Sequence, residues 1–292
     1  MTVVVAGGTG FIGKALVAAL AREGHDVAVV SRRPGAGMLT WEDIVNQGLP
    51  SCEAVINLAG RLPSEGRWTP AFKKELMDSR VWTTETLVRA IANNPPKVFI
   101  NASAVAYYPA LVDEVWTEGR VTTPDESFLS QVVHEWETAA RLPQGCPTRS
   151  ALVRIGVVLG RGGGVLEKLV QPFRWGLGAR LGTGYQPFPW VHLDDLVALF
   201  LFILRNEGAA GPFNGTAPGC VTNREFTRAL GKAVGRPAVL AIPAWTLRLA
   251  FGEMADMLLQ GQRVVPDKAI KMGFHFAYPT IESALADLVR RS

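Results

Sequence analysis

A glycine-rich turn between a strand and a helix, at the start of the chain, restricts the possible fold more than any other feature. Residues 2–6 read TVVVA, a β-branched apolar run typical of a strand buried on both faces. The turn over residues 7–13 reads GGTGFIG, and the residues after it, KALVAALAREG, have a helical pattern. A strand, a glycine-rich turn and a helix in this order indicate a nucleotide-binding site.

The residue types in this turn suit a bound diphosphate. Gly7 permits a tight turn, Gly10 lets the backbone approach the diphosphate, and Gly13 lets the helix pack closely on the strand. The first N–H groups of the helix have no partner within it and, with the helix dipole, attract phosphate. The alternative is a tight turn that binds no ligand. We expect five residues of the turn to contact the dinucleotide: Gly7, Thr9, Gly10, Phe11 and Ile12.

The end of the second strand indicates which dinucleotide fits. This strand, expected over residues 26–33, ends in Ser31, Arg32 and Arg33 and has no acidic residue there. NAD sites place Asp or Glu at this point, because a carboxylate binds the ribose 2′-hydroxyl and repels a 2′-phosphate. A guanidinium pairs with that phosphate in a fork geometry. Ser31 and Arg32 therefore predict NADP(H) rather than NAD(H), the alternative being that both arginines are ordinary surface charge.

Composition narrows the kinds of partner that the chain can have. The 292 residues are 48% hydrophobic and 19% charged, which is typical of a globular protein with a large core. The net charge is only +4 and the basic residues form no stripe, so we expect no nucleic-acid partner. The longest apolar run, residues 196–204, is too short to span a bilayer, so we expect no membrane partner.

The cysteines predict the compartment. Cys52, Cys146 and Cys220 show no metal-ligand spacing, and an odd, sparse count is typical of a reducing environment. We therefore expect no metal site and an intracellular location, either cytoplasmic or mitochondrial. The small-molecule substrate and the oligomeric state stay open.

Strands and helices alternate through the first two thirds of the chain. This pattern predicts an α/β fold with a doubly wound parallel sheet of the Rossmann type. We expect an NADP-binding domain over residues 1–160 and a smaller, mostly helical substrate or cap region over residues 161–292, with interleaving of the two allowed. Further strands are expected over residues 54–60, 97–104 and 150–159, and helices over residues 70–93 and 128–140. Asp194 and Asp195 open another helix, where carboxylates suit the dipole.

Ligands of such a sheet lie outside the carboxyl ends of its strands. Leu58, Ala59 and Gly60 follow the third strand, and small residues there let the backbone pass close to the ribose and the diphosphate. Arg80 lies on the following helix, and Glu75 lies about one turn before it. These two side chains either reach back to the nucleotide or lie on a solvated helix face.

Several motifs together resemble those of a known family. The segments GGTGFIG, NLAG, NASAVAYYP and PWVHLDDL resemble extended short-chain dehydrogenases/reductases, the group that includes nucleotide-sugar epimerases. Residues 243–285 are more specific and resemble the closing domain, of unknown function, of the atypical epimerase-like subfamily 39U. The resemblance covers essentially the whole chain. It implies NADP(H) as ligand and a substrate cleft between the sheet and the C-terminal part.

The resemblance also implies roles for particular residues. It places Ser31 and Arg32 at the 2′-phosphate and Val158 in the loop near the nicotinamide. Further nucleotide contacts are implied for the third strand end and the helix beside it: Leu58, Ala59, Glu75 and Arg80.

The residues that transfer protons in active members of the superfamily are absent. Those enzymes use Ser, Tyr and Lys, with Lys four residues after Tyr on one helix face and lowering the pKa of the Tyr. Ser103 lies at the expected strand end, but none of the four tyrosines has Lys four residues later. Phe128 stands in the place of the Tyr and Val132 in that of the Lys, and neither side chain can transfer a proton.

The remaining candidates leave two functions open. Tyr107 and Tyr108 follow Ser103 and either supply a hydroxyl to the cleft or pack the loop over the nicotinamide; we take Ser103 and Tyr108 as the candidate catalytic residues. His134 is expected on another helix face, at the surface. The chain is then either an NADP-dependent oxidoreductase or epimerase with unusual residues, or an NADP(H)-binding sensor or scaffold without turnover.

Overall fold

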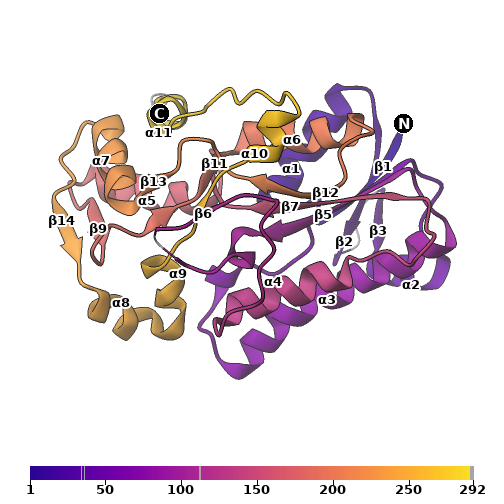
Figure 1. Cartoon of the computed structure of the whole chain (residues 1–292), viewed down its shortest axis with the longest axis horizontal. Helices are drawn as coiled ribbons and strands as arrows, with labels where there is room; N and C mark the ends of the chain where they lie inside the picture. The colour runs from indigo at the N-terminus through magenta and orange to yellow at the C-terminus, as the bar shows by residue number, and fades with distance from the viewer. Residues whose placement is uncertain (34, 36, 112, 290–292) are drawn as a thin grey trace.

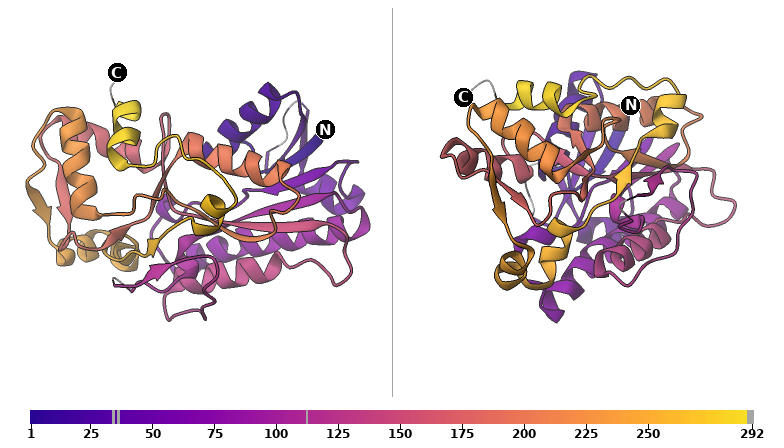
Figure 2. Two further views of the ribbon diagram at one scale, coloured as in Figure 1. Left: turned by 45° about the horizontal axis from the view of Figure 1, so that its top comes forward. Right: turned by 60° about the vertical axis from the view of Figure 1, so that its left-hand side comes forward.

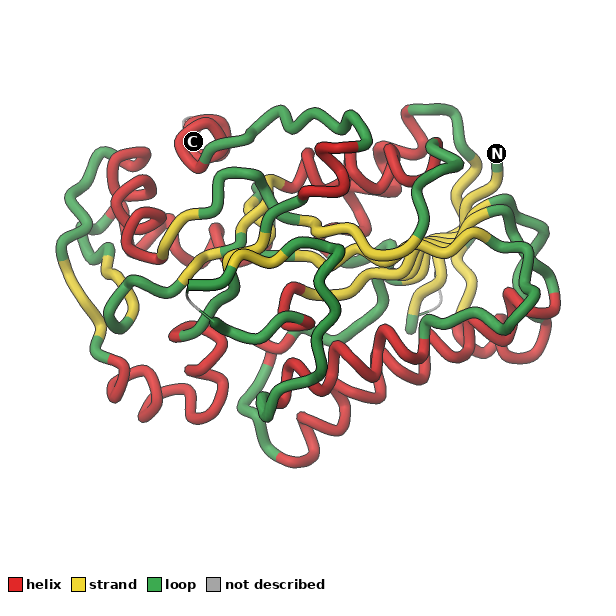
Figure 3. Tube along the Cα trace, viewed as in Figure 1, coloured by secondary structure: helices red, strands yellow, loops and turns green. Residues whose placement is uncertain are grey.

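A seven-stranded parallel sheet forms the middle layer of the larger part of the molecule (Figures 1 and 3). The computed structural model describes residues 1–33, 35, 37–111 and 113–289. The strand order is β12-β7-β5-β4-β1-β2-β3, which confirms the predicted doubly wound sheet. Its strands are β1 (Thr2–Ala6), β2 (Asp26–Ser31), β3 (Met38–Thr40), β4 (Ala54–Asn57), β5 (Val98–Ala104), β7 (Arg149–Ile155) and β12 (Gly211–Gly215).

Helices cover both faces of this sheet (Figures 1 and 2). One face carries α2 (Trp41–Gln47), α3 (Pro70–Asn93) and α4 (Phe128–Ala139). The other face carries α1 (Phe11–Arg22), α6 (Leu193–Arg205) and α10 (Asp267–Lys271). Two single-turn 3₁₀ helices lie in the connections, η1 (Pro63–Glu65) and η2 (Val105–Tyr107).

Strand β1 shows why its sequence is apolar without interruption. Val3 and Val5 belong to the core cluster under α1 and α6, whereas Val4 and Ala6 belong to the cluster under α2 and α3. All four side chains are completely buried. Successive side chains of a strand point to opposite faces, so a strand covered on both sides needs an apolar residue at every position.

The smaller part of the molecule, on the left of Figure 1, consists of short strand pairs and helices. Its parallel pairs are β8 (Val157–Leu159) with β11 (Trp190–His192), and β9 (Ala179–Leu181) with β14 (Leu240–Ile242). Strand β10 (Pro187–Phe188) pairs antiparallel with β13 (Val221–Thr222), and β6 (Val115–Trp116) pairs parallel with β15 (Arg263–Val264). The helical elements are α5 (Gly164–Arg174), α7 (Asn223–Val234), α8 (Ala244–Phe251), η3 (Gly252–Met254), α9 (Ala255–Leu259) and α11 (Ile281–Val289).

The two parts are interleaved along the sequence. The chain leaves the main sheet at Gly156, where a Cβ atom would lie 2.3 Å from the carbonyl oxygen of Pro189. The single strand expected over residues 150–159 is therefore two strands, β7 in the main sheet and β8 in the smaller part. Helix α6 and strand β12 later return to the larger part, and β12 forms an edge of the sheet.

Most predicted elements agree with the structure, and their differences have local causes. The helix over residues 70–93 is confirmed at both ends, and its start is capped by the Thr69 side chain, which accepts the Phe72 N–H at 3.2 Å. The second strand ends at Ser31 and the third at Asn57, earlier than expected. The Asn57 side chain accepts the N–H of Ala59 at 3.0 Å, which turns the chain out of the strand. The short strands that were not predicted are β3, β6, β9, β10, β11, β13 and β15.

Asp195 connects the C-terminal segment to the larger part. Its carboxylate accepts the backbone N–H groups of Ala277 and Tyr278 at 2.8 and 2.9 Å. Burial raises the pKa of Asp195, and the two N–H groups act in the opposite direction. Both carboxylates lie in the first turn of α6, as predicted, but the Asp194 side chain is 73% exposed, whereas Asp195 also binds the C-terminal segment.

We expect Asp195→Ala to lower the free energy of unfolding by about 3 kcal/mol, because two backbone N–H groups lose a buried, charged acceptor. The matched control is Asp194→Ala, which should change stability by no more than about 0.5 kcal/mol. Urea unfolding followed by circular dichroism measures both. Equal losses for the two variants would contradict the role given to Asp195.

Candidate functional site

The glycine-rich turn has the backbone geometry of a phosphate site. Gly7 has a φ of +77°, a conformation that favours glycine. A Cβ atom on Gly13 would lie 2.2 Å from the carbonyl oxygen of Gly7, so α1 starts in direct contact with the turn. Thr9 and Gly10 are exposed, and no side chain caps the first turn of α1. Its N–H groups therefore remain available to an anion.

The fold brings several of the predicted apolar contacts together beside this turn. They are partly buried and pack against the same core cluster: Phe11, Ile12, Leu58 and Val158. The Phe11 ring fills the space at Gly163, where a Cβ atom would lie 2.5 Å from it. This contact explains the glycine run that follows β8. A cavity of about 350 Å³ beside it is lined by Phe11, Lys14, Ala15, Arg161, Gly162 and Leu193.

Two asparagines fix the chain where β4 ends. The Asn57 amide donates to Asn101 Oδ1 at 2.7 Å and to Thr84 Oγ1 at 2.9 Å. Its own oxygen holds the Ala59 N–H, and both asparagines are completely buried. Because every polar atom in this contact has a partner, the backbone of residues 58–60 is held at the carboxyl edge of the sheet. Sequence reasoning identified this edge but missed the asparagine pair.

The predicted helix residues Arg80 and Glu75 both lie against this loop. A Cβ atom on Gly60 would be 3.2 Å from the Arg80 guanidinium carbon. That guanidinium also lies 5.1 Å from the Trp136 ring, and burial lowers the pKa of Arg80 to about 10. The Glu75 carboxylate forms an ion pair with Arg61 and has a largely exposed side chain. The two residues therefore differ in position: Arg80 packs into the site, whereas Glu75 lies at its rim.

Ser31 and Arg32 end strand β2 at the same edge of the sheet. Ser31 is buried, and its hydroxyl accepts the backbone N–H of Arg33 at 3.3 Å. Arg32 is exposed, and it takes part in no ion pair within the described residues. Its guanidinium is therefore free to bind an anion from solution.

Ser103 belongs to a buried polar network that sequence reasoning missed. Its hydroxyl donates to Glu137 Oε1 at 2.6 Å. Arg154 donates two hydrogen bonds to the same carboxylate, at 2.8 and 2.9 Å. A charged residue in the middle of a buried strand is the sequence feature that points to such a network, since an isolated buried charge is costly.

Tyr108 lies at the other end of this network. Its side chain is 0% exposed, and its hydroxyl lies 2.8 Å from Arg154 Nη1 and 2.9 Å from Asn214 Oδ1. Burial raises the pKa of Tyr108, against the influence of Arg154. The ring also stacks on Trp116, with 5.5 Å between the ring centroids. The hydroxyl also lies 3.3 Å from the Thr117 carbonyl oxygen. A buried hydroxyl with three partners fits the alternative in which Tyr108 packs the loop, and does not fit contact with a substrate.

Tyr107 and the start of α4 complete the site. Tyr107 is half-buried, stacks on His134 at 4.4 Å and covers the Arg154 guanidinium at 3.3 Å. His134, expected at the surface, is half-buried, because its ring stacks on Tyr107. Phe128 packs edge-on against Trp68, and Val132 is buried.

Neither a metal centre nor a membrane-spanning helix is found among the described residues. His, Cys, Asp and Glu side chains form no group of three or more that could hold a metal ion in that part of the chain. Its helices are also too short or too polar to cross a bilayer.

A doubly wound parallel sheet, with a glycine-rich turn opening its first helix at the carboxyl edge, defines a Rossmann-type nucleotide-binding protein. A family model described as the NAD dependent epimerase/dehydratase family matches residues 3–214. The chain belongs to this family. A second model, a domain of unknown function (DUF1731), matches residues 242–288, in the region where the closing domain is expected.

Relatives of similar length extend the likeness over the whole chain. Epimerase family protein SDR39U1 from Bos taurus is 45% identical over 296 residues, covering 99% of this chain and 100% of the relative. A crystal structure of human epimerase family protein SDR39U1 with NADPH has a TM-score of 0.97 and 42% identity, with full coverage of both chains. UDP-N-acetylglucosamine 4-epimerase from Bacillus cereus shares the fold, with a TM-score of 0.79 and 19% identity.

We expect Glu137→Gln to lower the free energy of unfolding by about 3 kcal/mol, because Arg154 is left buried without a counter-charge. The matched control, Glu135→Gln, removes an exposed carboxylate from the same helix and should cost no more than about 0.5 kcal/mol. Chemical denaturation measures both. A Glu137 variant as stable as the control would show that Arg154 does not depend on this partner.

Proposed function

We propose that the chain binds NADP(H) at the carboxyl edge of its main sheet. The observation that carries the proposal is the uncapped start of α1 at Gly10, together with a free Arg32 at the end of β2. The diphosphate would lie on the N–H groups of the turn, and Ser31 and Arg32 would hold the 2′-phosphate. The NADPH in the human relative, at 42% identity, supports this choice.

The other predicted contacts fit the same ligand. Leu58, Ala59 and Gly60 would pass the ribose and diphosphate, with Arg80 behind Gly60 and Glu75 at the rim. Val158 would lie near the nicotinamide, because β8 and Phe11 pack beside the turn. When bound, the nucleotide supplies hydride chemistry, and the side chains of this chain bind and orient it.

We infer that the chain departs from the usual proton transfer of its superfamily. Ser103 has one hydroxyl proton and gives it to Glu137, so only its lone pairs remain for a second partner. The Tyr108 hydroxyl is sealed, and Phe128 and Val132 carry no proton. These observations favour the NADP(H)-binding sensor or scaffold over an oxidoreductase or epimerase of unknown substrate.

We expect Arg32→Ala to weaken NADPH binding by about 1.5–3 kcal/mol, because a charge-assisted pair to the 2′-phosphate is lost. Binding of NADH, which lacks this phosphate, should stay the same. Fluorescence titration with both nucleotides measures the difference, and Arg22→Ala, at the far end of α1, is the control. An unchanged NADPH affinity would remove Arg32 from the site.

The second test asks whether the bound nucleotide reacts. NADPH absorbance is followed with a broad panel of carbonyl compounds and nucleotide sugars. We expect tight NADPH binding without consumption, because general acid–base catalysis, worth about 10²–10⁴-fold, has no free proton donor. Consumption that Ser103→Ala or Tyr108→Phe abolishes, and that Ser51→Ala or Tyr185→Phe leaves intact, would establish the enzyme instead.

A further inference from the structure

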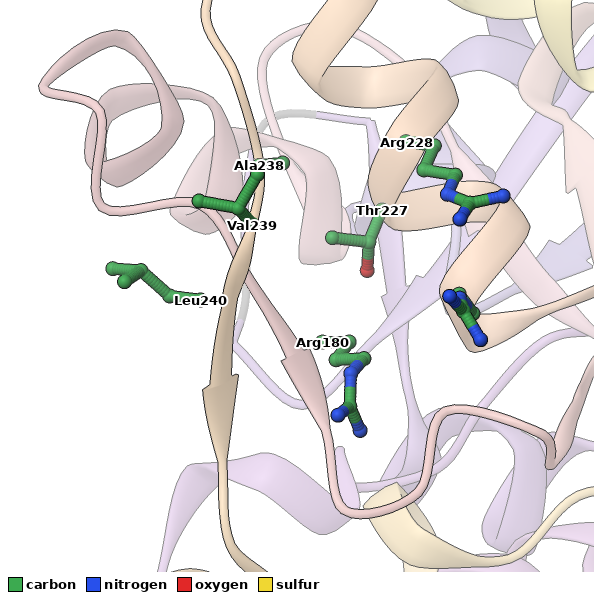
Figure 4. Close-up of a pocket in the computed structure, with 7 residues that line it drawn as sticks. Arg180, Thr227, Arg228, Ala238, Val239 and Leu240 are labelled. Atoms are coloured by element: carbon green, nitrogen blue, oxygen red, sulfur yellow. The ribbon is translucent and has the colours of Figure 1, made fainter.

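A second cavity lies in the smaller part of the molecule, away from the carboxyl edge of the main sheet where NADP(H) is proposed to bind. It measures about 190 Å³ and lies between strands β9 and β14 and helix α7. Figure 4 shows the Thr227 hydroxyl directed towards Arg180, with Arg228 above them and residues 238–240 on the opposite side. Its lining consists of three arginines, one threonine and a short apolar wall: Arg180, Arg224, Thr227, Arg228, Ala238, Val239 and Leu240.

The three guanidiniums together carry more positive charge than Glu225, which attracts Arg228, can balance. None of Arg180, Arg224 and Arg228 forms an ion pair in the part of the chain that the structure describes. Glu225, on the same helix as two of them, uses its carboxylate to cap that helix at Thr222, with hydrogen bonds of 2.7 and 2.9 Å. Three like charges around one cavity repel each other unless an anion lies between them.

Two of these arginines are held in position by neutral partners. Arg180 donates to the carbonyl oxygens of Gly182 and Thr183 at 2.6 and 3.0 Å. Arg224 donates to the Tyr185 hydroxyl at 3.3 Å. These contacts orient the side chains and leave their charge in place. Further N–H groups of each fork remain for a ligand.

We propose that this cavity binds the phosphate group of a phosphorylated molecule. Guanidinium forks match phosphate oxygens, and a phosphate carries more charge than a carboxylate to balance three arginines. The Thr227 hydroxyl adds a donor, and residues 238–240 offer an apolar wall to the rest of the ligand. Strands β9 and β14 and helix α7 lie at the end of the molecule away from α1 and β1 (Figure 1), so this site is separate from the proposed nucleotide site.

The phosphate can come from a free metabolite or from a lipid headgroup. The outer wall has apolar side chains in solvent, since Val239 is 82% exposed and Leu240 is 46% exposed. A headgroup in the cavity would bring this wall to a membrane surface, whereas a free phosphate ester would not need it. Both sources share the same phosphate chemistry at the three arginines.

The test uses the full chain saturated with NADPH, so that the first phosphate site is filled. Inorganic phosphate is titrated by calorimetry at constant ionic strength, with acetate as comparison. We expect saturable phosphate binding, weakened about tenfold or more in Arg228→Gln and in Arg224→Gln. Lys232→Gln removes one charge from an exposed position on the same helix and should bind phosphate like the wild type.

Vesicle sedimentation separates the two sources. Vesicles of phosphatidylcholine with and without phosphatidic acid are mixed with the same variants. Retention that requires phosphatidic acid and is lost in Arg228→Gln identifies a headgroup, whereas phosphate binding without retention identifies a free ligand. No saturable phosphate binding, or an equal loss in Lys232→Gln, overturns the proposal. NADPH binding is measured separately, so failure at this cavity leaves the proposal for the nucleotide edge intact.

Discussion

The contact between Gly13 and the carbonyl oxygen of Gly7 determines where the first helix begins, and the site depends on it. A Cβ atom at position 13 would lie 2.2 Å from that oxygen, so a side chain there would push α1 away from the turn. Without the close contact, the uncapped N–H groups at Gly10 would not face the carboxyl edge of the sheet. The loop after β4 is fitted to the same turn, because a Cβ atom at Gly7 would lie 2.7 Å from the Leu58 carbonyl.

Buried polar groups impose the next constraint, since each must find a partner. The network that starts at Ser103 passes through Glu137 and Arg154 to Tyr108 and ends at Asn214. Arg154 donates to the Glu137 carboxylate and to the Tyr108 hydroxyl oxygen, while Ser103 donates its proton to the same carboxylate. The interactions that stabilise the site therefore already engage the Ser103 proton and the Tyr108 hydroxyl.

Local sequence patterns correctly predicted those elements whose structure depends only on neighbouring residues. The apolar run of β1, the glycine turn and the Thr69-capped helix α3 each follow from neighbouring residues, and the structure has them as expected. The change of strand at Gly156 was not predictable, because it depends on the approach of Pro189, thirty-three positions later. The partners of Arg154 lie on other elements as well. The sequence therefore indicated Ser103 and Tyr108 as candidates but showed neither the network that joins them nor their burial.

Because the two parts are interleaved along the chain, a few residues connect the main sheet to the smaller part. Asn214 Oδ1 accepts a hydrogen bond from the Tyr108 hydroxyl, and its amide donates to the Val265 carbonyl at 2.9 Å, so one side chain on edge strand β12 bridges both parts. Glu118 supports it, since its carboxylate accepts the backbone N–H groups of Asn214 and Lys268 at 2.9 and 3.1 Å. The network that fixes Ser103 therefore extends to the backbone of Val265 and Lys268, and together with Asp195 it holds the C-terminal segment.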